Sequence, residues 1–186
     1  AVVEDEFEEK VLIPYDNLFK FDGKVIHAIA TSIQRREITV SLDGHQKNIP
    51  FEYLAIATGS NYPRPGKMED DNKSEAAKKI VEQRNAIKDA KRILIIGGGP
   101  VGIELAGEIA TNYQDKQITL VHSDTGLLNS KFPPKIRNML ADQLKELNVK
   151  LVFGEKVDLT SGNLNGLTTT TLKTNKDTVI ESDVQF

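Results

Sequence analysis

Residues 92–108 read Arg-Ile-Leu-Ile-Ile-Gly-Gly-Gly-Pro-Val-Gly-Ile-Glu-Leu-Ala-Gly-Glu, and this stretch decides the fold. Ile93–Ile96 is apolar at every position, which is typical of a parallel strand buried on both faces. Gly97, Gly99 and Gly102 then fill a G-x-G-x-x-G pattern, which combines a tight turn, a close approach to a pyrophosphate and helix–strand packing. Pro100 suits the first helical position, and a helix N-terminus offers free N–H groups to phosphate oxygens. The stretch predicts a strand, a dinucleotide-binding turn and a helix.

The neighbouring sequence strengthens this interpretation. An alanine-rich apolar helix is expected over about residues 100–113, and a second strand over Gln117–Val121 completes a βαβ unit of about thirty residues. The alternative is a glycine turn that binds no ligand. It is the less favoured interpretation, because each glycine lowers the stability of the folded backbone, and a turn that binds no ligand does not require three glycines at this spacing.

Composition excludes several classes of function. The chain has 186 residues and a net charge of −3, so it has no electrostatic reason to bind nucleic acid. It contains no cysteine, which excludes disulfides, thiolate metal sites and a redox-active dithiol within these residues. The three histidines, His27, His45 and His122, are isolated and show no metal-ligand spacing, so no metal site is predicted. Without a signal peptide or an apolar run long enough to span a bilayer, we expect a soluble intracellular protein.

The first part of the chain is predicted to be mostly β-structure. The acidic segment Ala1–Lys10 is expected to be a solvated face or a frayed end, followed by a short strand over Val11–Tyr15. Asp43-Gly44 is a strong hairpin signal between two runs of apolar residues. An antiparallel meander is therefore expected, and a further strand should end at a turn of small residues. The predicted strands are Val25–Ile33, Glu37–Leu42, Lys47–Phe51 and Tyr53–Ala57.

A proline- and glycine-rich crossing follows, and a domain boundary is predicted near Pro63–Lys67. A helix capped by Ser74 should then lead to the glycine-rich unit. Beyond the second strand of that unit, the sequence predicts a helix from Pro133-Pro134 to Asn148 and a third parallel strand over Val149–Phe153. A second antiparallel meander and the beginning of one more strand are expected after it, over residues 157–159, 168–174, 178–180 and 183–186.

The order of these motifs resembles the two-dinucleotide-binding-domain flavoprotein family. Leu-Ala-Ile-Ala-Thr-Gly-Ser at residues 54–60 precedes the proline-rich crossing, and Ile-Ile-Gly-Gly-Gly-Pro-Val-Gly-Ile-Glu-Leu-Ala-Gly-Glu at residues 95–108 follows it. Within the family the chain is most similar to the apoptosis-inducing-factor-like NAD(P)H:quinone oxidoreductases, the group that contains ferroptosis suppressor protein. The resemblance covers essentially the whole chain, including Gln-Ile-Thr-Leu-Val-His-Ser at residues 117–123.

This resemblance implies a fold class and a division into domains. The expected fold is α/β, a Rossmann-like three-layer NAD(P)-binding domain with an antiparallel β-meander, preceded by part of an FAD-binding domain. Residues 1–62 would be the partial FAD domain, 63–90 a linker and helix, and 91–186 the NAD(P)H-binding domain. Family members also carry an upstream G-x-G-x-x-G unit and a downstream Gly-Asp motif for the flavin, so the chain is expected to be an internal fragment that binds FAD poorly and is inactive alone.

The resemblance also implies the site residues. The expected pyrophosphate site is Gly97, Gly98, Gly99, Pro100, Val101 and Gly102. In similar flavoproteins a glutamate at the position of Glu104 orients the nicotinamide, although a glutamate in a first helical turn is also favoured by the helix dipole alone. The adenine would lie near Ala30, and the flavin near Thr58 and Gly59.

Coenzyme choice is expected to be made at His122 and Ser123, where the second strand ends. NAD-binding folds usually place an acid there for the ribose hydroxyls, and NADP-binding folds an arginine. This sequence has neither at that point, since Asp124 follows one position late, and both NADH and NADPH therefore stay open. Lys131 is interpreted as a solvated residue rather than a ligand of the adenosine.

The resemblance implies hydride transfer from NAD(P)H to FAD and then electron transfer to a quinone or another small acceptor. Two alternatives stay open: a reductase of an iron–sulfur protein, and a non-catalytic module that only binds NAD(P)H. A full-length protein of this family is expected in the cytoplasm or peripherally on a membrane, mitochondrion or lipid droplet.

Overall fold

The computed structural model describes residues 3–15, 17–19, 21–61, 72–162 and 167–186. Its chain forms two compact units, of which the first combines residues 1–12 with 62–186 and the second comprises residues 13–61. The predicted domain boundary at residues 63–67 lies outside the described residues.

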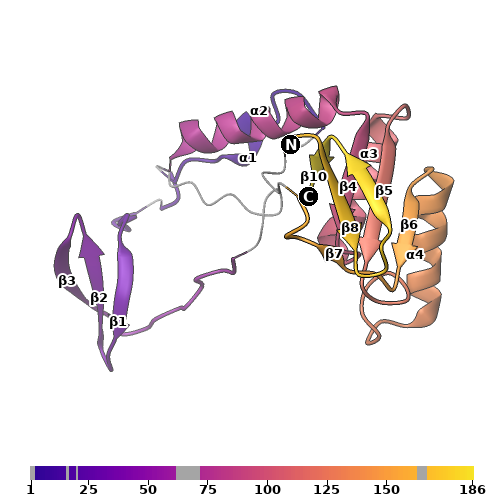
Figure 1. Cartoon of the computed structure of the whole chain (residues 1–186). Coiled ribbons are helices and arrows are strands. Elements are labelled where there is room, and N and C mark those ends of the chain that lie inside the picture. The colour runs from indigo at the N-terminus through magenta and orange to yellow at the C-terminus, as the bar shows by residue number, and fades with distance from the viewer. Residues whose placement is uncertain (1–2, 16, 20, 62–71, 163–166) are drawn as a thin grey trace. The chain divides into compact units, whose positions relative to one another are not determined.

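The first unit is built on a parallel sheet of four strands in the order β10-β4-β5-β6 (Figure 1). Strand β4 and its two successors in the sequence confirm the three predicted parallel strands. Strand β10 pairs in parallel with β4 on its other side, so the strand predicted to begin near the end of the sequence completes this sheet. The bounds are Arg92–Ile96 for β4, Gln117–His122 for β5, Lys150–Phe153 for β6 and Val184–Gln185 for β10.

Helices cover one face of the parallel sheet. Helix α3 spans Pro100–Asn112 and α4 spans Pro134–Glu146, as the sequence predicts to within a residue or two. Their apolar residues pack on alternate strand residues, because side chains along a strand point to opposite faces. The shared core includes Ile93, Ile95, Ile118 and Leu120 from the strands and Leu105, Ala106, Ile109, Ala141 and Leu144 from the helices.

A three-stranded antiparallel meander covers the other face. It contains β7 (Val157–Asp158), β8 (Thr170–Thr174) and β9 (Val179–Ser182). The residues that β4 and β5 turn to this face, Leu94 and Val121, form a second core with Leu172 and Ile180. The unit therefore has three layers, helices, parallel sheet and meander, which confirms the predicted fold class.

Asp183 fastens the last strand of the sheet to its centre. Its carboxylate accepts hydrogen bonds from the backbone N–H groups of Lys91 (3.0 Å) and Arg92 (2.9 Å). The same carboxylate accepts from Arg92 Nη2 at 2.6 Å, while Arg92 Nη1 pairs with Glu181 Oε2 at 2.6 Å. These bonds, above all the guanidinium, lower the pKa of Asp183 from 3.8 to about 2.

Replacing Asp183 by asparagine should therefore make stability less dependent on acid pH. A carboxylate with a depressed pKa stabilises the fold above its unfolded value, and this contribution disappears as pH falls from about 4 to about 2. We expect Asp183→Asn to lower the free energy of unfolding by about 1–2 kcal/mol at pH 7 and by progressively less below pH 4. Urea unfolding at pH 7, 4 and 2.5 measures this, with the exposed Asp115→Asn as control. An equal loss at every pH would contradict the assignment.

The N-terminal segment packs on helix α2 with most of its acidic residues exposed, so of the two predicted alternatives it is a solvated face and not a frayed end. Helix α1 spans Glu8–Val11 and α2 spans Lys73–Asp89. The acidic charges are ordered because Arg84, which is buried in α2, pairs with Glu8 Oε2 at 2.5 Å and with Asp5 Oδ1 at 3.1 Å. The cap of α2 is also corrected. Asn72, rather than Ser74, accepts the first backbone N–H groups, including that of Ser74 at 2.8 Å.

The second unit contains an antiparallel sheet in the order β1-β2-β3. Its strands are Ile29–Ile33, Glu37–Leu42 and His45–Pro50, so the predicted meander is confirmed with a shorter first strand. Asp43 and Gly44 connect β2 to β3 with φ values of +49° and +81°. A two-residue turn with both φ values positive matches the twist of a hairpin, which is why Asp-Gly was informative.

Two strands predicted in the first sixty residues are absent from the described structure. Val11–Tyr15 continues from α1 without strand structure, and Tyr53–Ala57 has no strand beside it. Their apolar side chains are exposed, 74% for Ile13 and 93% for Tyr53. A β-propensity pattern forms a strand only where another strand takes its backbone hydrogen bonds. Neither segment has such a neighbour among the described residues.

Candidate functional site

The glycine turn joins β4 to α3 at the carboxyl edge of the parallel sheet. Gly97 has a φ of +120°, a conformation that L side chains rarely adopt, and its N–H donates to Val121 O at 2.8 Å. Gly102, in the first turn of α3, lies against this bend. A Cβ atom there would be 2.0 Å from Gly97 O and 3.3 Å from Ile95 Cγ2. Glycine at position 102 thus lets the helix approach both the turn and the strand.

The outer side of the turn fits an anionic ligand. A Cβ atom added at Gly97 or Gly99 would meet nothing within 4 Å, so open space lies beside this backbone. Gly99 is the N-cap of α3 and supplies no side-chain cap. Within the described residues, the N–H groups of Gly99, Val101 and Gly102 have no acceptor. Unpaired N–H groups at the positive end of a helix dipole favour phosphate oxygens.

The loop after β5 lies against the glycine turn. Leu128 N donates to Gly98 O at 2.7 Å, and His122 Nε2 lies 3.2 Å from Leu128 O. Arg137 of α4 supports the loop from another side, because its Nε donates to Leu127 O at 2.8 Å. Sequence reasoning missed Leu128 and Arg137. Both act through backbone carbonyls or N–H groups, and such contacts leave no pattern in the sequence.

The structure brings some of the predicted site residues together. The turn, His122 and Ser123 lie at one edge of the sheet, and Ser123 is exposed. Glu104 is exposed in the first two turns of α3. The residues predicted near the adenine and the flavin, Ala30, Thr58 and Gly59, belong to the second unit, where all three are exposed and Gly59 has a φ of +69°.

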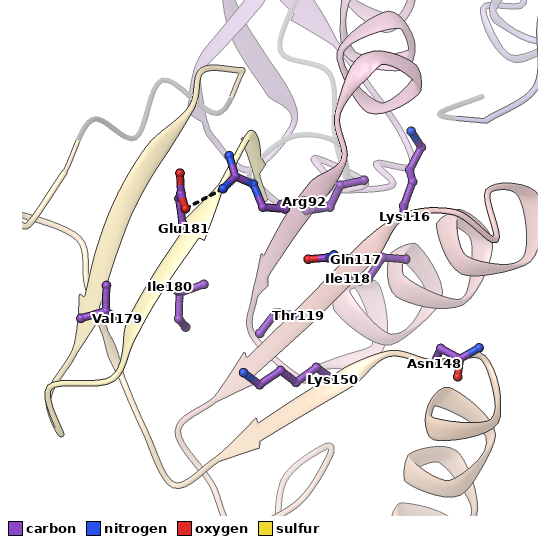
Figure 2. Close-up of a pocket in the computed structure, with 11 residues that line it drawn as sticks. Arg92, Lys116, Gln117, Ile118, Thr119, Asn148, Lys150, Val179, Ile180 and Glu181 are labelled. Atoms are coloured by element: carbon purple, nitrogen blue, oxygen red, sulfur yellow. Dashed lines mark ion pairs between the residues drawn. The ribbon is translucent and has the colours of Figure 1, made fainter.

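A cavity of about 430 Å³ lies at the opposite edge of the parallel sheet, where the strands begin (Figure 2). Arg92, Gln117, Thr119 and Lys150 contribute to its lining from the sheet, and Val179–Glu181 from β9. Two of its cations are already engaged: Arg92 pairs with Glu181 and Asp183, and Lys116 Nζ donates to the carbonyls of Lys88 and Ala90. Because this cavity is remote from the glycine turn, it is distinct from the dinucleotide site.

Two kinds of feature are absent from the described part of the chain. Among those residues, none of the helices combines the length and the apolar character that a bilayer crossing requires. The same residues contain no group of three or more histidine, cysteine, aspartate or glutamate side chains placed to hold a metal ion.

The chain belongs to the pyridine nucleotide–disulphide oxidoreductase family, which it matches over residues 4–186. It is 41% identical to an FAD-dependent oxidoreductase of Flammulina velutipes over 85% of this chain and 50% of that protein. It is 37% identical to apoptosis-inducing factor homolog A of Dictyostelium discoideum over 86% of this chain and 40% of that protein. It is 32% identical to human ferroptosis suppressor protein 1 over 84% of this chain and 42% of that protein. The chain thus spans at most half the length of these relatives.

Solved structures share the fold. A water-forming NADH oxidase of Lactobacillus brevis, bound to NADH, superposes with a TM-score of 0.60 and 23% identity over 86% of this chain and 35% of that one. A ferredoxin reductase of Rhodopseudomonas palustris superposes with a TM-score of 0.65 and 18% identity over 86% of this chain and 39% of that one. The predicted membership of a flavoprotein oxidoreductase family is confirmed, and so, at the level of the family, are FAD and NADH or NADPH as its cofactors.

Proposed function

We propose that this chain carries the NAD(P)H site of an FAD-dependent oxidoreductase that reduces a quinone-type acceptor. The observation that carries the proposal is the glycine turn at the N-terminus of α3, where open space lies beside Gly97 and Gly99 and where, among the described residues, the N–H groups of Gly99, Val101 and Gly102 have no acceptor. Membership of the family and similarity to an FAD-dependent oxidoreductase support the two cofactors. The quinone follows from the sequence resemblance to the apoptosis-inducing-factor-like group.

Each part of the chain has a definite task in this proposal. Gly97–Gly102 binds the pyrophosphate through backbone N–H groups, and the loop after β5, including Ser123, lies beside the adenosine ribose. Glu104 orients the nicotinamide, since it is exposed near the start of α3. Ala30 lies near the adenine of FAD, and Thr58 and Gly59 lie near its flavin. When bound, the cofactors supply hydride transfer from the nicotinamide to the flavin and then two electrons for the acceptor.

The proposal divides the activity between this chain and the rest of a longer protein. The chain spans at most half the length of its relatives. Binding of NAD(P)H by this chain and the complete reaction of a full-length protein must therefore be tested separately. We propose that the complete reaction also needs the flavin-binding segments expected of full-length members of the family. The same observation favours a second candidate function, a module that binds NAD(P)H without catalysis, for this polypeptide alone.

Titration of the purified chain with NADH and with NADPH, followed by the fluorescence of the reduced nicotinamide, tests the site. We expect saturable binding below millimolar concentration without the yellow colour of bound flavin. Failure to bind either coenzyme at millimolar concentration would remove the support for a dinucleotide site.

Catalysis is tested in a flavin-loaded, full-length protein that contains this sequence. We expect NAD(P)H oxidation coupled to quinone reduction, and a Glu104→Gln variant that still binds NAD(P)H while its flavin is reduced more slowly. Binding without any flavin reduction in the wild type would favour the non-catalytic module. Unchanged flavin reduction in Glu104→Gln would contradict the role given to this glutamate.

A further inference from the structure

Leu128 has an unusual backbone conformation beside the glycine turn. Its φ is +59°, in the left-handed region that a bulky residue seldom occupies. The side chain is 6% exposed, so burial holds it in place. A residue in such a conformation costs about 1–3 kcal/mol and persists only where its surroundings impose it, which is common at ligand-binding segments.

Two hydrogen bonds impose this conformation, one on each polar backbone group of Leu128. Its N–H donates to Gly98 O at 2.7 Å, within the glycine turn. Its carbonyl accepts from His122 Nε2 at 3.2 Å. Since a carbonyl oxygen only accepts, Nε2 must carry the proton in this hydrogen bond. His122 is therefore engaged through Nε2 and does not offer this nitrogen to a coenzyme.

The His122 ring also sets the position of the glycine turn directly. A Cβ atom added at Gly98 would lie 2.9 Å from His122 Cγ and 3.0 Å from His122 Cδ2. Side-chain carbons do not approach that closely, so the ring packs against bare backbone at Gly98. His122 thus contacts both the turn expected to hold the pyrophosphate and the loop expected to hold the adenosine ribose.

We propose that His122 is a positioning residue that sets the glycine turn and the loop after β5 in the geometry required for coenzyme binding. This inference rests on the proposed function and changes the role predicted from the sequence, in which His122 touches the coenzyme itself. Arg137 supports the same loop through the carbonyls of Gly126 and Leu127, so that the loop is held on both sides before a ligand arrives. Such preorganisation raises affinity because less ordering remains for the binding step.

The test compares His122→Phe with His122→Gln. Phenylalanine keeps a ring beneath Gly98 but has no donor, whereas glutamine keeps a donor near the position of Nε2. We expect His122→Phe to raise the dissociation constant for NADH about tenfold and His122→Gln to raise it no more than about threefold. The exchange of the Leu128 amide hydrogen, followed by NMR without ligand, should quicken in His122→Phe. His45→Phe, at an exposed histidine of β3, is the matched control and should change neither quantity.

The outcomes separate this inference from the proposed function. A wild type that binds neither coenzyme overturns the proposed function and the positioning role with it. A wild type that binds NADH, with His122→Phe binding equally well, overturns the positioning role alone. Unchanged Leu128 exchange in His122→Phe also overturns it, because the hydrogen bond would then not hold the loop. Weaker binding, quicker exchange and partial rescue by glutamine support it.

Discussion

Replacing Gly102 by alanine is expected to lower the free energy of unfolding by about 3 kcal/mol and to abolish coenzyme binding. The added Cβ would lie 2.0 Å from Gly97 O, and this neighbour is backbone, so no side-chain rotation can relieve the contact. The helix or the turn must move instead, and overpacking of this kind typically costs about 1–3 kcal/mol. Urea unfolding and NADH titration measure the two effects.

The same substitution at two other glycines provides matched controls. At Gly107, within α3, an added Cβ meets nothing within 4 Å, so alanine should stabilise the helix by about 0.5–1 kcal/mol. Gly99 also has open space around it, but that space is the one assigned to the pyrophosphate. Gly99→Ala should therefore change stability by about 1 kcal/mol or less and still weaken NADH binding at least tenfold. Full affinity in Gly99→Ala would mean that the ligand does not approach this backbone.

The glycines of the turn, Gly97, Gly99 and Gly102, show why the parallel sheet could be predicted from the sequence. The apolar run of β4, the turn and the start of α3 are local, and each residue type there is required by its own backbone neighbourhood. The strand and helix periodicities after the turn are local as well, so α3, β5, α4 and β6 were predicted within a few residues. Such predictions need no knowledge of distant partners.

The errors occurred where the outcome depends on distant residues. Tyr53–Ala57 has the composition of a strand but no neighbouring strand in the described structure, and the acidic segment around Glu8 pairs with Arg84, which lies more than seventy residues away in the sequence. The hydrogen bond between His122 and the Leu128 carbonyl was also not predicted, since this carbonyl belongs to a residue whose conformation the sequence does not reveal. These errors have a common cause: strand pairing, ion pairs and hydrogen bonds to backbone carbonyls join residues that the sequence does not show to be neighbours.

A buried cation of α2, Arg84, joins this helix to α1 and the residues before it. Arg84 is 6% exposed, and its Nη1 donates both to Glu8 Oε2 at 2.5 Å and to Glu4 O at 3.0 Å. The hydrogen bond from Arg84 is also the main reason that the pKa of Glu8 is lowered. A buried charge pair adds little net stability compared with apolar packing, but removing one partner leaves the other uncompensated.

Arg84→Met should therefore lower the free energy of unfolding by about 3 kcal/mol at pH 7 and release residues 3–12 from α2. A lowered carboxylate pKa stabilises the fold above the ordinary value of 4.5, and this contribution is lost as pH falls through the folded-state pKa. In Arg84→Met that part of the acid dependence should disappear. Urea unfolding at several pH values and the rate of tryptic cleavage after Lys10 report the two effects.

Lys78→Met, at an exposed lysine of the same helix, should stay within about 0.5 kcal/mol of the wild type. If both variants behaved alike, with Lys10 equally protected, the N-terminal segment would be held by its apolar contacts rather than by Arg84.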